Sequence, residues 1–295
     1  MAQLTKIFKY TFLISVLFST SVSYSGGPWT QKKGEGYFKL SQYWLKYDQH
    51  YTDLGKIDPN VTTGIYNTSI YGEFGITNRF TTTLYLPFFS RNLTNNIISE
   101  ATGELVEKGD AVNSIGDSDI GLKYSLTKPG AKFPVSVSLV LGIPLGKDVA
   151  GINNNLQTGD GEFNQILSVD AGTGFKISEK IQSYASVNLG FNNRSNDFSE
   201  EIRYGLEYGV GFNEKLWLIA RVFGVESLKN GPPSSSIVST GIFANNTEYT
   251  SVGIEAAYYL KKRWGVSASI TGAFRGEIIA AAPAYNVGVF FDMSK

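Results

Sequence analysis

Residues 202–212 alternate strictly between apolar side chains and side chains that are small or charged. The apolar positions are Ile202, Tyr204, Leu206, Tyr208, Val210 and Phe212, and the positions between them are Arg203, Gly205, Glu207, Gly209 and Gly211. Because successive side chains of a β-strand point to opposite faces, this segment predicts a strand with one wholly apolar face. The pattern recurs to the end of the chain, which indicates a barrel in a membrane.

About twelve segments carry this pattern, and each is close to the roughly 9–11 residues that a tilted transmembrane strand requires. They cover residues 37–47, 65–76, 80–89, 118–126, 135–144, 163–175, 182–192, 201–212, 216–226, 247–260, 264–274 and 284–293. The chain is rich in glycine, tyrosine and phenylalanine, with 32, 17 and 19 residues, which suits strands that need small residues on one face and rings on the other. We therefore predict an all-β fold, a transmembrane antiparallel β-barrel of about 12 strands.

The connections between these segments alternate in length. Residues 77–79, 127–134, 176–181, 213–215 and 261–263 form short connections, whereas 48–64, 90–117, 145–162 and 227–246 are long and polar. Outer-membrane barrels have short periplasmic turns and long external loops, and an even strand count returns both chain ends to the periplasm.

A soluble β-sandwich also has alternating strands, but the aromatic residues favour a barrel. Rings on the apolar faces collect at both strand ends, for example Phe80, Phe175 and Trp264 at one end and Phe191 and Tyr285 at the other. Aromatic rings prefer the two interfaces of a membrane, so two girdles are expected of a barrel.

The N-terminal 25 residues are typical of a signal peptide. Lys6 and Lys9 precede an apolar run over residues 10–22, and small residues follow at 23–25. The run is shorter than the roughly 20 residues of a membrane-spanning helix. We expect residues 1–25 to be a signal peptide and residues 26–295 to form the barrel domain, in the outer membrane of a Gram-negative bacterium.

Two further features concern partners. Residues 286–293 resemble the C-terminal recognition signal of outer-membrane proteins, with Met293 where an aromatic residue is usual, so we expect contact with the barrel-assembly machinery as well as with outer-membrane lipid. Lys+Arg and Asp+Glu both number 26, so no nucleic-acid partner is expected.

Two stretches of the chain resemble a known family. Residues 115–126 (IGDSDIGLKYSL), and residues 141–146 together with 157–161, resemble the GxGDxxxGLKYxL and LPTGxG patterns of the transporter family linked to the meta-pathway of phenol degradation. The second pattern is split here, because an insertion separates Pro144 from Thr158. The resemblance implies an outer-membrane transport barrel and leaves the substrate open.

A barrel of about 12 strands has a narrow interior, so the inward side chains decide what passes. On the predicted inward face, the charged candidates for a solute path are Glu73, Asp119, Lys123, Asp170, Arg203, Glu207, Arg221 and Glu255, with Lys39 beside them, and the aromatic candidates are Tyr71, Tyr85, Tyr184, Trp217 and Phe223. Neither sign of charge is in excess. The charged residues either line a path or pair across the interior, and the rings either contact a solute or pack against an infolded loop.

Two segments are candidates for narrowing the pore. Residues 90–117 form the longest loop, which is either a constriction or an external display segment. Residues 26–35 are too few to be a substantial plug.

These features predict a channel for passive passage of a small-molecule solute of hydrophobic or aromatic character. The alternative is a structural or adhesive barrel that acts through its external loops. We expect no enzyme and no cofactor, because the only histidine, His50, is placed in a loop and no phosphate-binding glycine loop precedes a helix. Asp148, Asp160 and Glu162 are of the type that binds Ca²⁺ but lack a recognisable ligand spacing, so no metal site is predicted.

Overall fold

The structure, a computed structural model, describes residues 27–99, 101–232 and 243–295. The predicted signal peptide, residues 1–25, lies outside the described residues. Within the described ranges, no helix is long and apolar enough to cross a membrane.

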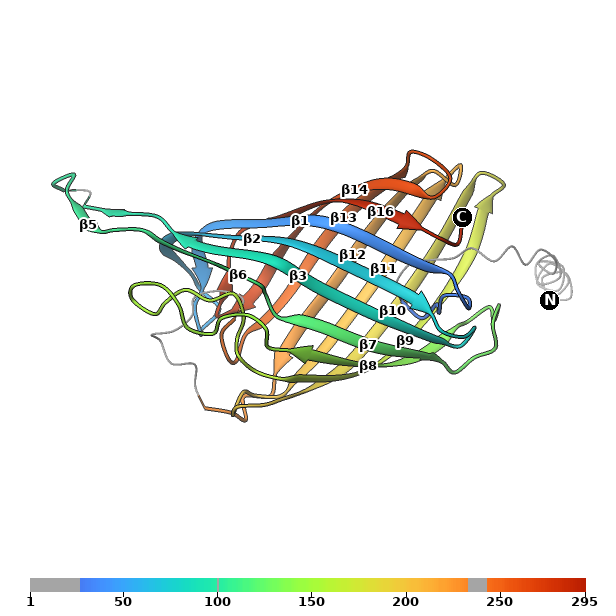
Figure 1. Ribbon diagram of the computed structural model, residues 1–295, viewed down its shortest axis with the longest axis horizontal. Helices are drawn as coiled ribbons and strands as arrows, with labels where there is room; N and C mark the ends of the chain where they lie inside the picture. The colour runs from blue at the N-terminus through green and yellow to red at the C-terminus, as the bar shows by residue number, and fades with distance from the viewer. Residues whose placement is uncertain (1–26, 100, 233–242) are drawn as a thin grey trace, which may run out of the picture.

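Twelve antiparallel strands close into a barrel (Figure 1). They are β1 (Gly36–Tyr51), β2 (Ile57–Gly75), β3 (Phe80–Thr94), β7 (Ser118–Ser125), β8 (Val135–Ile143), β9 (Asn164–Ser178), β10 (Ile181–Arg194), β11 (Glu201–Phe212), β12 (Leu216–Ser227), β13 (Glu248–Tyr259), β14 (Trp264–Glu277) and β16 (Ala284–Asp292). Each pairs with its neighbours along the chain, and β1 pairs with both β2 and β16, which closes the ring. The predicted fold class is confirmed, and every predicted strand is present.

The external side of the barrel differs from the prediction. β1 and β2 continue as a hairpin, so only residues 52–56 remain as a turn where a loop over 48–64 was expected. In the predicted loop 90–117, β3 continues to Thr94 and pairs with β6 (Asp110–Ser114), and β4 (Ile97–Ile98) pairs with β5 (Leu105–Glu107) at the tip. This tip projects beyond the barrel mouth in Figure 1, which agrees with the alternative of an external display segment and not with that of a constriction. Backbone pairing continues outside the membrane without an apolar face, which leaves no alternation to detect.

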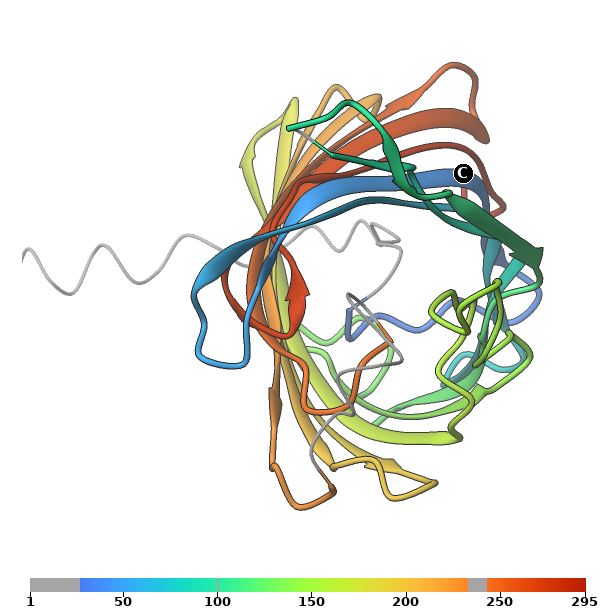
Figure 2. The same cartoon turned by 90° about the vertical axis from the view of Figure 1, so that its left-hand side faces the viewer.

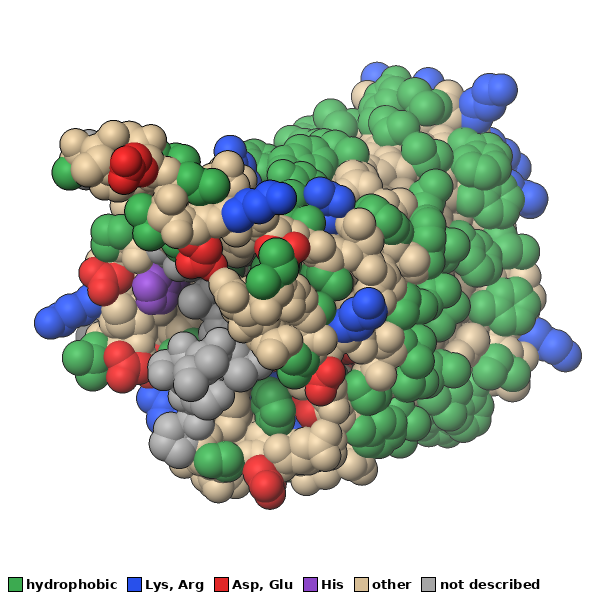
Figure 3. Space-filling view, turned by 60° about the vertical axis from the view of Figure 1, so that its left-hand side comes forward, with side chains coloured by type: hydrophobic (Ala, Val, Ile, Leu, Met, Phe, Trp, Pro, Cys, Tyr) green, Lys and Arg blue, Asp and Glu red, His purple; other side chains and the backbone are tan. Residues whose placement is uncertain are grey.

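The lipid-facing wall is an apolar belt, visible as a broad green surface in Figure 3. Leucine, valine and isoleucine side chains are exposed along the strand middles, for example Leu189, Leu206 and Ile254. Rings mark the two edges of the belt: Trp264 and Phe291 lie with ring centroids 4.9 Å apart at one edge, and Trp44 stacks on Tyr285 at the other. The alternation therefore places apolar side chains toward lipid and small or polar ones inside.

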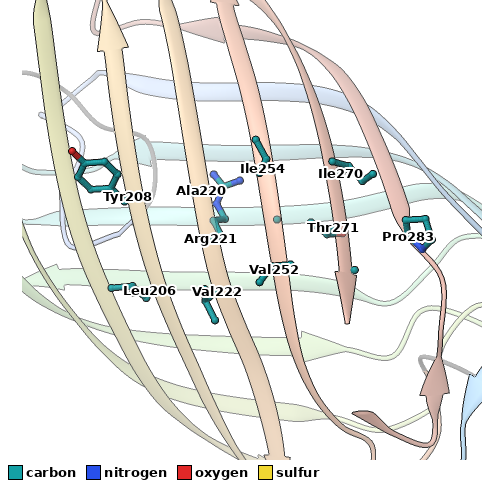
Figure 4. Close-up of a pocket in the computed structure, with 12 residues that line it drawn as sticks. Leu206, Tyr208, Ala220, Arg221, Val222, Val252, Ile254, Ile270, Thr271 and Pro283 are labelled. Carbon is teal, nitrogen blue, oxygen red and sulfur yellow. The ribbon is translucent and has the colours of Figure 1, made fainter. Parts of the chain in front are cut away.

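The belt is hollowed over β11 to β14 (Figure 4). It is a groove of about 500 Å³ lined almost wholly by apolar side chains, among them Tyr208, Val222, Ile254 and Ile270. Ala220 is paired in register with Tyr208 and Ile254, so its short side chain leaves space between them.

Candidate channel lumen

Arg221 lies at the centre of an ion-pair network inside the barrel. Its Nε donates to Glu207 on β11, and its Nη1 donates to Glu255 on β13, with 2.6 Å between Nη1 and Oε2. Lys39 of β1 donates from Nζ to the other oxygen of Glu255 at 2.9 Å. Arg221 points inward because Ala220 and Val222, on either side of it, are exposed to lipid. Two cations thus balance two carboxylates.

Aromatic side chains continue this network toward the end of the barrel that carries both described chain ends. The hydroxyl of Tyr184 donates to Glu207, and the Tyr184 side chain is buried. Its ring packs against Trp217, with 5.8 Å between centroids, and against the edge of Trp29, with 5.5 Å between centroids. Trp29 precedes the first strand, so the N-terminal segment reaches this wall.

The opposite wall contacts the same segment through polar groups. Glu73, which is completely buried, accepts hydrogen bonds from the Tyr71 hydroxyl and from Nε2 of Gln31. Lys123 donates from Nζ to the carbonyl of Gly27 at 2.8 Å. These contacts involve three of the predicted lumenal residues.

Residues 27–35 therefore lie inside the barrel, as the blue segment within the ring in Figure 2 shows. The backbone N–H of Gln31 donates to Oγ1 of Thr81, and Gly34 and Glu35 pair with the backbone of Gly75. A Cβ at residue 75 would overlap the carbonyls of Gln31 and Lys32, so this close approach needs glycine. This segment was predicted to be too short for a substantial plug, and in the structure it nevertheless contacts opposite walls of the lumen through Trp29 and Gln31.

The external half of the lumen is lined with rings. Phe223 and Tyr249 contact edge to face, Tyr85 is paired in register with the inward Tyr71, and Tyr43 packs against the apolar cluster that lies beyond these rings. Beyond them, a buried apolar cluster is formed by Leu45, Tyr47, Ile65, Ala280 and Ala284. Ala280 belongs to β15 (Ile279–Ala280), which pairs with β1 just before β16 begins. Residues 279–280 thus also fold against the inner wall.

Three candidates remain. Asp170 accepts from Nδ2 of Asn188 at 2.9 Å, Asp119 lies opposite Tyr85 in the register, and Arg203 donates to Glu201. All thirteen predicted residues lie on the inward face, but in separate groups. Trp29 and Gln31 were missed, because no local pattern marks a side chain that reaches the lumen from outside the alternating strands. Glu201 was missed although it shares the inward parity of Arg203, because it is the first residue of its strand.

A second ionic cluster lies at the external mouth. Arg194 donates to Asp160, Glu162 and Glu201 through its three nitrogens, at 3.0, 2.8 and 2.7 Å. Burial raises the pKa of Asp160 and of Glu162, and the charge of Arg194 partly offsets both shifts. Two of the three residues considered for Ca²⁺ are therefore bound to an arginine. Among the described residues, no group of three or more His, Cys, Asp and Glu could hold a metal ion.

Asp117 brings together the two halves of the split sequence pattern. Its Oδ1 accepts from the backbone N–H of Gly146 and its Oδ2 from that of Asp160, both at 2.8 Å. Lys147 and Thr158 exchange hydrogen bonds across the base of the insertion. Only glycine fits at position 159, where a Cβ would overlap the Asp117 carboxylate. Burial raises the pKa of Asp117 to about 7.

Comparison with known proteins agrees with this architecture. Residues 54–277 match the family described as "Putative MetA-pathway of phenol degradation". No curated protein matches the chain. The solved structure of the COG4313 outer membrane channel from Pseudomonas putida F1 has a TM-score of 0.61 at 14% identity, and the match covers 92% of this chain and 100% of that one.

Two other solved barrels are more distant. The KdgM porin in complex with disordered oligogalacturonate has a TM-score of 0.47 at 8% identity, with 86% of this chain and 98% of that one covered. The CymD monoaromatic hydrocarbon channel has a TM-score of 0.41 at 10% identity, with 89% of each chain covered.

Proposed function

The chain belongs to the family described as "Putative MetA-pathway of phenol degradation", and on that premise we propose that it passes a small hydrophobic or aromatic solute passively. It is a β-barrel of the bacterial outer membrane. The observation that carries the proposal is the order of linings along the lumen: rings in the external half, then an ion network without net charge.

The rings offer the contact that an aromatic solute needs. Phe223 and Tyr249 meet edge to face, Tyr43 and Tyr85 lie on the inward face of their strands, and aromatic pairs gain about 0.5–1.5 kcal/mol beyond the area they bury.

The ion network argues against strong charge selection. Lys39 and Arg221 are matched by Glu207 and Glu255, and a pore selects ions through an excess of one charge sign. The network also leaves these groups paired, so a neutral solute does not have to displace them.

We also propose how the chain reaches the outer membrane. Residues 1–25 serve as a signal peptide that is removed, residues 26–295 form the barrel domain, and the final strand is recognised by the barrel-assembly machinery. The solute is the only small-molecule partner that we propose, and we assign neither a catalytic step nor a cofactor to the chain.

Two measurements on the purified, folded barrel test the channel. Planar-bilayer recordings should show discrete conductance steps, and liposomes that contain the barrel should admit a neutral phenolic solute faster than a neutral sugar. The variant Phe223→Ala should slow phenolic entry more than it changes ion conductance. Ile219→Ala, a nearby inward residue on the same strand, is the matched control.

A barrel that neither conducts nor speeds solute entry would overturn the channel. It would favour the alternative of a structural or adhesive surface protein, for which the projecting β4–β5 tip offers an external contact segment.

A further inference from the structure

Basic residues gather at the end of the barrel where the described chain ends lie. The turns 126–134, 179–180, 213–215 and 260–263 each expose at least one lysine, and residues 261–263 expose two lysines and an arginine. We call these four turns the basic rim. Within them the exposed carboxylates are only those of Glu179 and Glu214. Figure 3 shows blue side chains beyond the apolar belt at this end.

Exposed apolar side chains flank the same cations. Phe133 follows Lys132, whose Nζ lies 5.6 Å from the centre of the Phe133 ring. Leu260 and Trp264 enclose residues 261–263, and both are more than half exposed, at 61% and 51%. Aromatic and aliphatic residues at the edge of the belt mark the depth where hydrocarbon gives way to headgroups. The cations of the rim therefore lie at headgroup level.

The lysines of the rim have no ionic partner inside the protein. Within the described ranges, no lysine of these four turns lies within ion-pair distance of a carboxylate. At the external end, by contrast, Arg194 binds three carboxylates, and Arg275 and Lys229 bind Glu226 and Glu277. An anion that approaches these lysines need not compete with a carboxylate of the described residues, whereas Arg263 already donates from Nε to the main-chain oxygen of Lys295.

We propose that the basic rim binds the anionic headgroups of phospholipids in the adjoining membrane leaflet. The cations are spread over four turns around the barrel, which matches a layer of headgroup phosphates and not a single phosphate ion. Lysine suits this position because its aliphatic stem lies along apolar surface while the ammonium group stays in water.

Lipid selectivity tests the proposal. The full mature barrel is reconstituted in phosphatidylcholine vesicles that contain trace spin-labelled phosphatidylglycerol or spin-labelled phosphatidylcholine, and the fraction of motionally restricted label is compared. We expect the wild type to prefer phosphatidylglycerol. The variant Lys261→Gln/Lys262→Gln/Arg263→Gln should lower this preference by at least about fivefold at low salt. Added salt should weaken it in the wild type, because exposed charges are screened.

Two further variants separate the loss of rim cations from a folding defect and from a general loss of charge. Lys180→Gln/Lys215→Gln removes rim cations from other turns and should also lower the preference, so a folding defect at 260–263 would not decide the outcome. Lys56→Gln/Lys108→Gln removes exposed cations at the external end and should leave the preference unchanged.

Equal restriction of both labels in the wild type would overturn the proposal, as would an equal loss in the control. A barrel that shows no lipid preference but is retained on isolated peptidoglycan through its rim lysines would instead assign this surface to the cell wall.

Discussion

Arg221 binds two carboxylates that come from the strands on either side of it. Its replacement should change both the stability of the barrel and its ion selectivity. In Arg221→Gln, Glu207 loses its cationic partner while Glu255 keeps Lys39. The Arg221 side chain is 31% exposed, so lumenal water screens part of the cost, and we expect a loss of about 1–3 kcal/mol. Urea unfolding in micelles measures it.

The same variant leaves one uncompensated negative charge in the lumen. In a salt gradient, the reversal potential of Arg221→Gln should therefore shift in the direction that indicates a preference for cations. Arg275→Gln is the control, because Arg275 is an exposed ion-pair partner of Glu226 and such pairs contribute about 0–1 kcal/mol. Equal effects of the two variants would contradict a central role for Arg221.

Asp117 gives the external mouth a dependence on pH. Its pKa is raised by burial from 3.8 to about 7, so between these values the folded state binds more protons than the unfolded state. The stability contributed by this group is present below pH 3.8 and is lost as the pH rises through about 7. Asp160 and Glu162 have raised pKa values and act in the same direction, while Arg194 opposes them.

In the wild type, the urea concentration at the midpoint of unfolding should fall as the pH rises from 3.8 to 7. We therefore expect Asp117→Asn to make this fall smaller without abolishing it. Asp53→Asn, in the exposed turn between β1 and β2, is the control and should retain the wild-type slope. A slope that Asp117→Asn leaves unchanged would show that this carboxyl does not titrate in the range.

At the scale of elements, we expect the N-terminal segment to limit the proposed pore. Trp29 and Gln31 join it to opposite walls, through Tyr184 and Glu73. The variant Trp29→Ala/Gln31→Ala should loosen this segment and raise the mean single-channel conductance at least severalfold. Lys32→Gln/Lys33→Gln changes exposed residues of the same segment and should leave conductance near the wild-type value. An unchanged conductance in the first variant would mean that the passage lies elsewhere.

The alternation of apolar and polar side chains predicts the membrane-spanning strands of this molecule but not its other segments. Lipid outside and polar groups inside impose period two on each spanning strand, so Leu206 and Glu207 could be assigned to opposite faces from sequence. Nothing imposes that period on residues 48–64, where backbone pairing continues beyond the membrane, or on residues 27–35, which contacts with the barrel wall hold inside the lumen. The ion-pair partners of the inward charges could not be predicted from sequence either, because Lys39 contacts Glu255 only as a result of the tilt and register of the closed sheet.

At the scale of the whole molecule, charge is distributed between the two ends despite a formal net charge of zero. Cations without carboxylate partners lie in the tight turns, paired ions lie at the external mouth, and a neutral network lies between them. Composition alone hides this arrangement, because it becomes visible only once the topology assigns each turn to an end. The barrel thus presents different chemistry to each side of the membrane.

Closure of the ring is the condition for all of these features, and it depends on β16. This strand pairs with β1 on one side and β14 on the other, and Met293 adds a hydrogen bond from its N–H to the carbonyl of Gly36. Deletion of residues 284–295 would leave two strand edges unpaired in lipid, where each unsatisfied backbone group costs several kcal/mol. We therefore expect this variant to lose heat-modifiable gel migration and to be extracted by urea from membranes. Deletion of residues 294–295 alone should leave heat-modifiable migration and resistance to urea extraction intact, since these residues lie beyond β16. A closed, heat-modifiable barrel without β16 would contradict this account of closure.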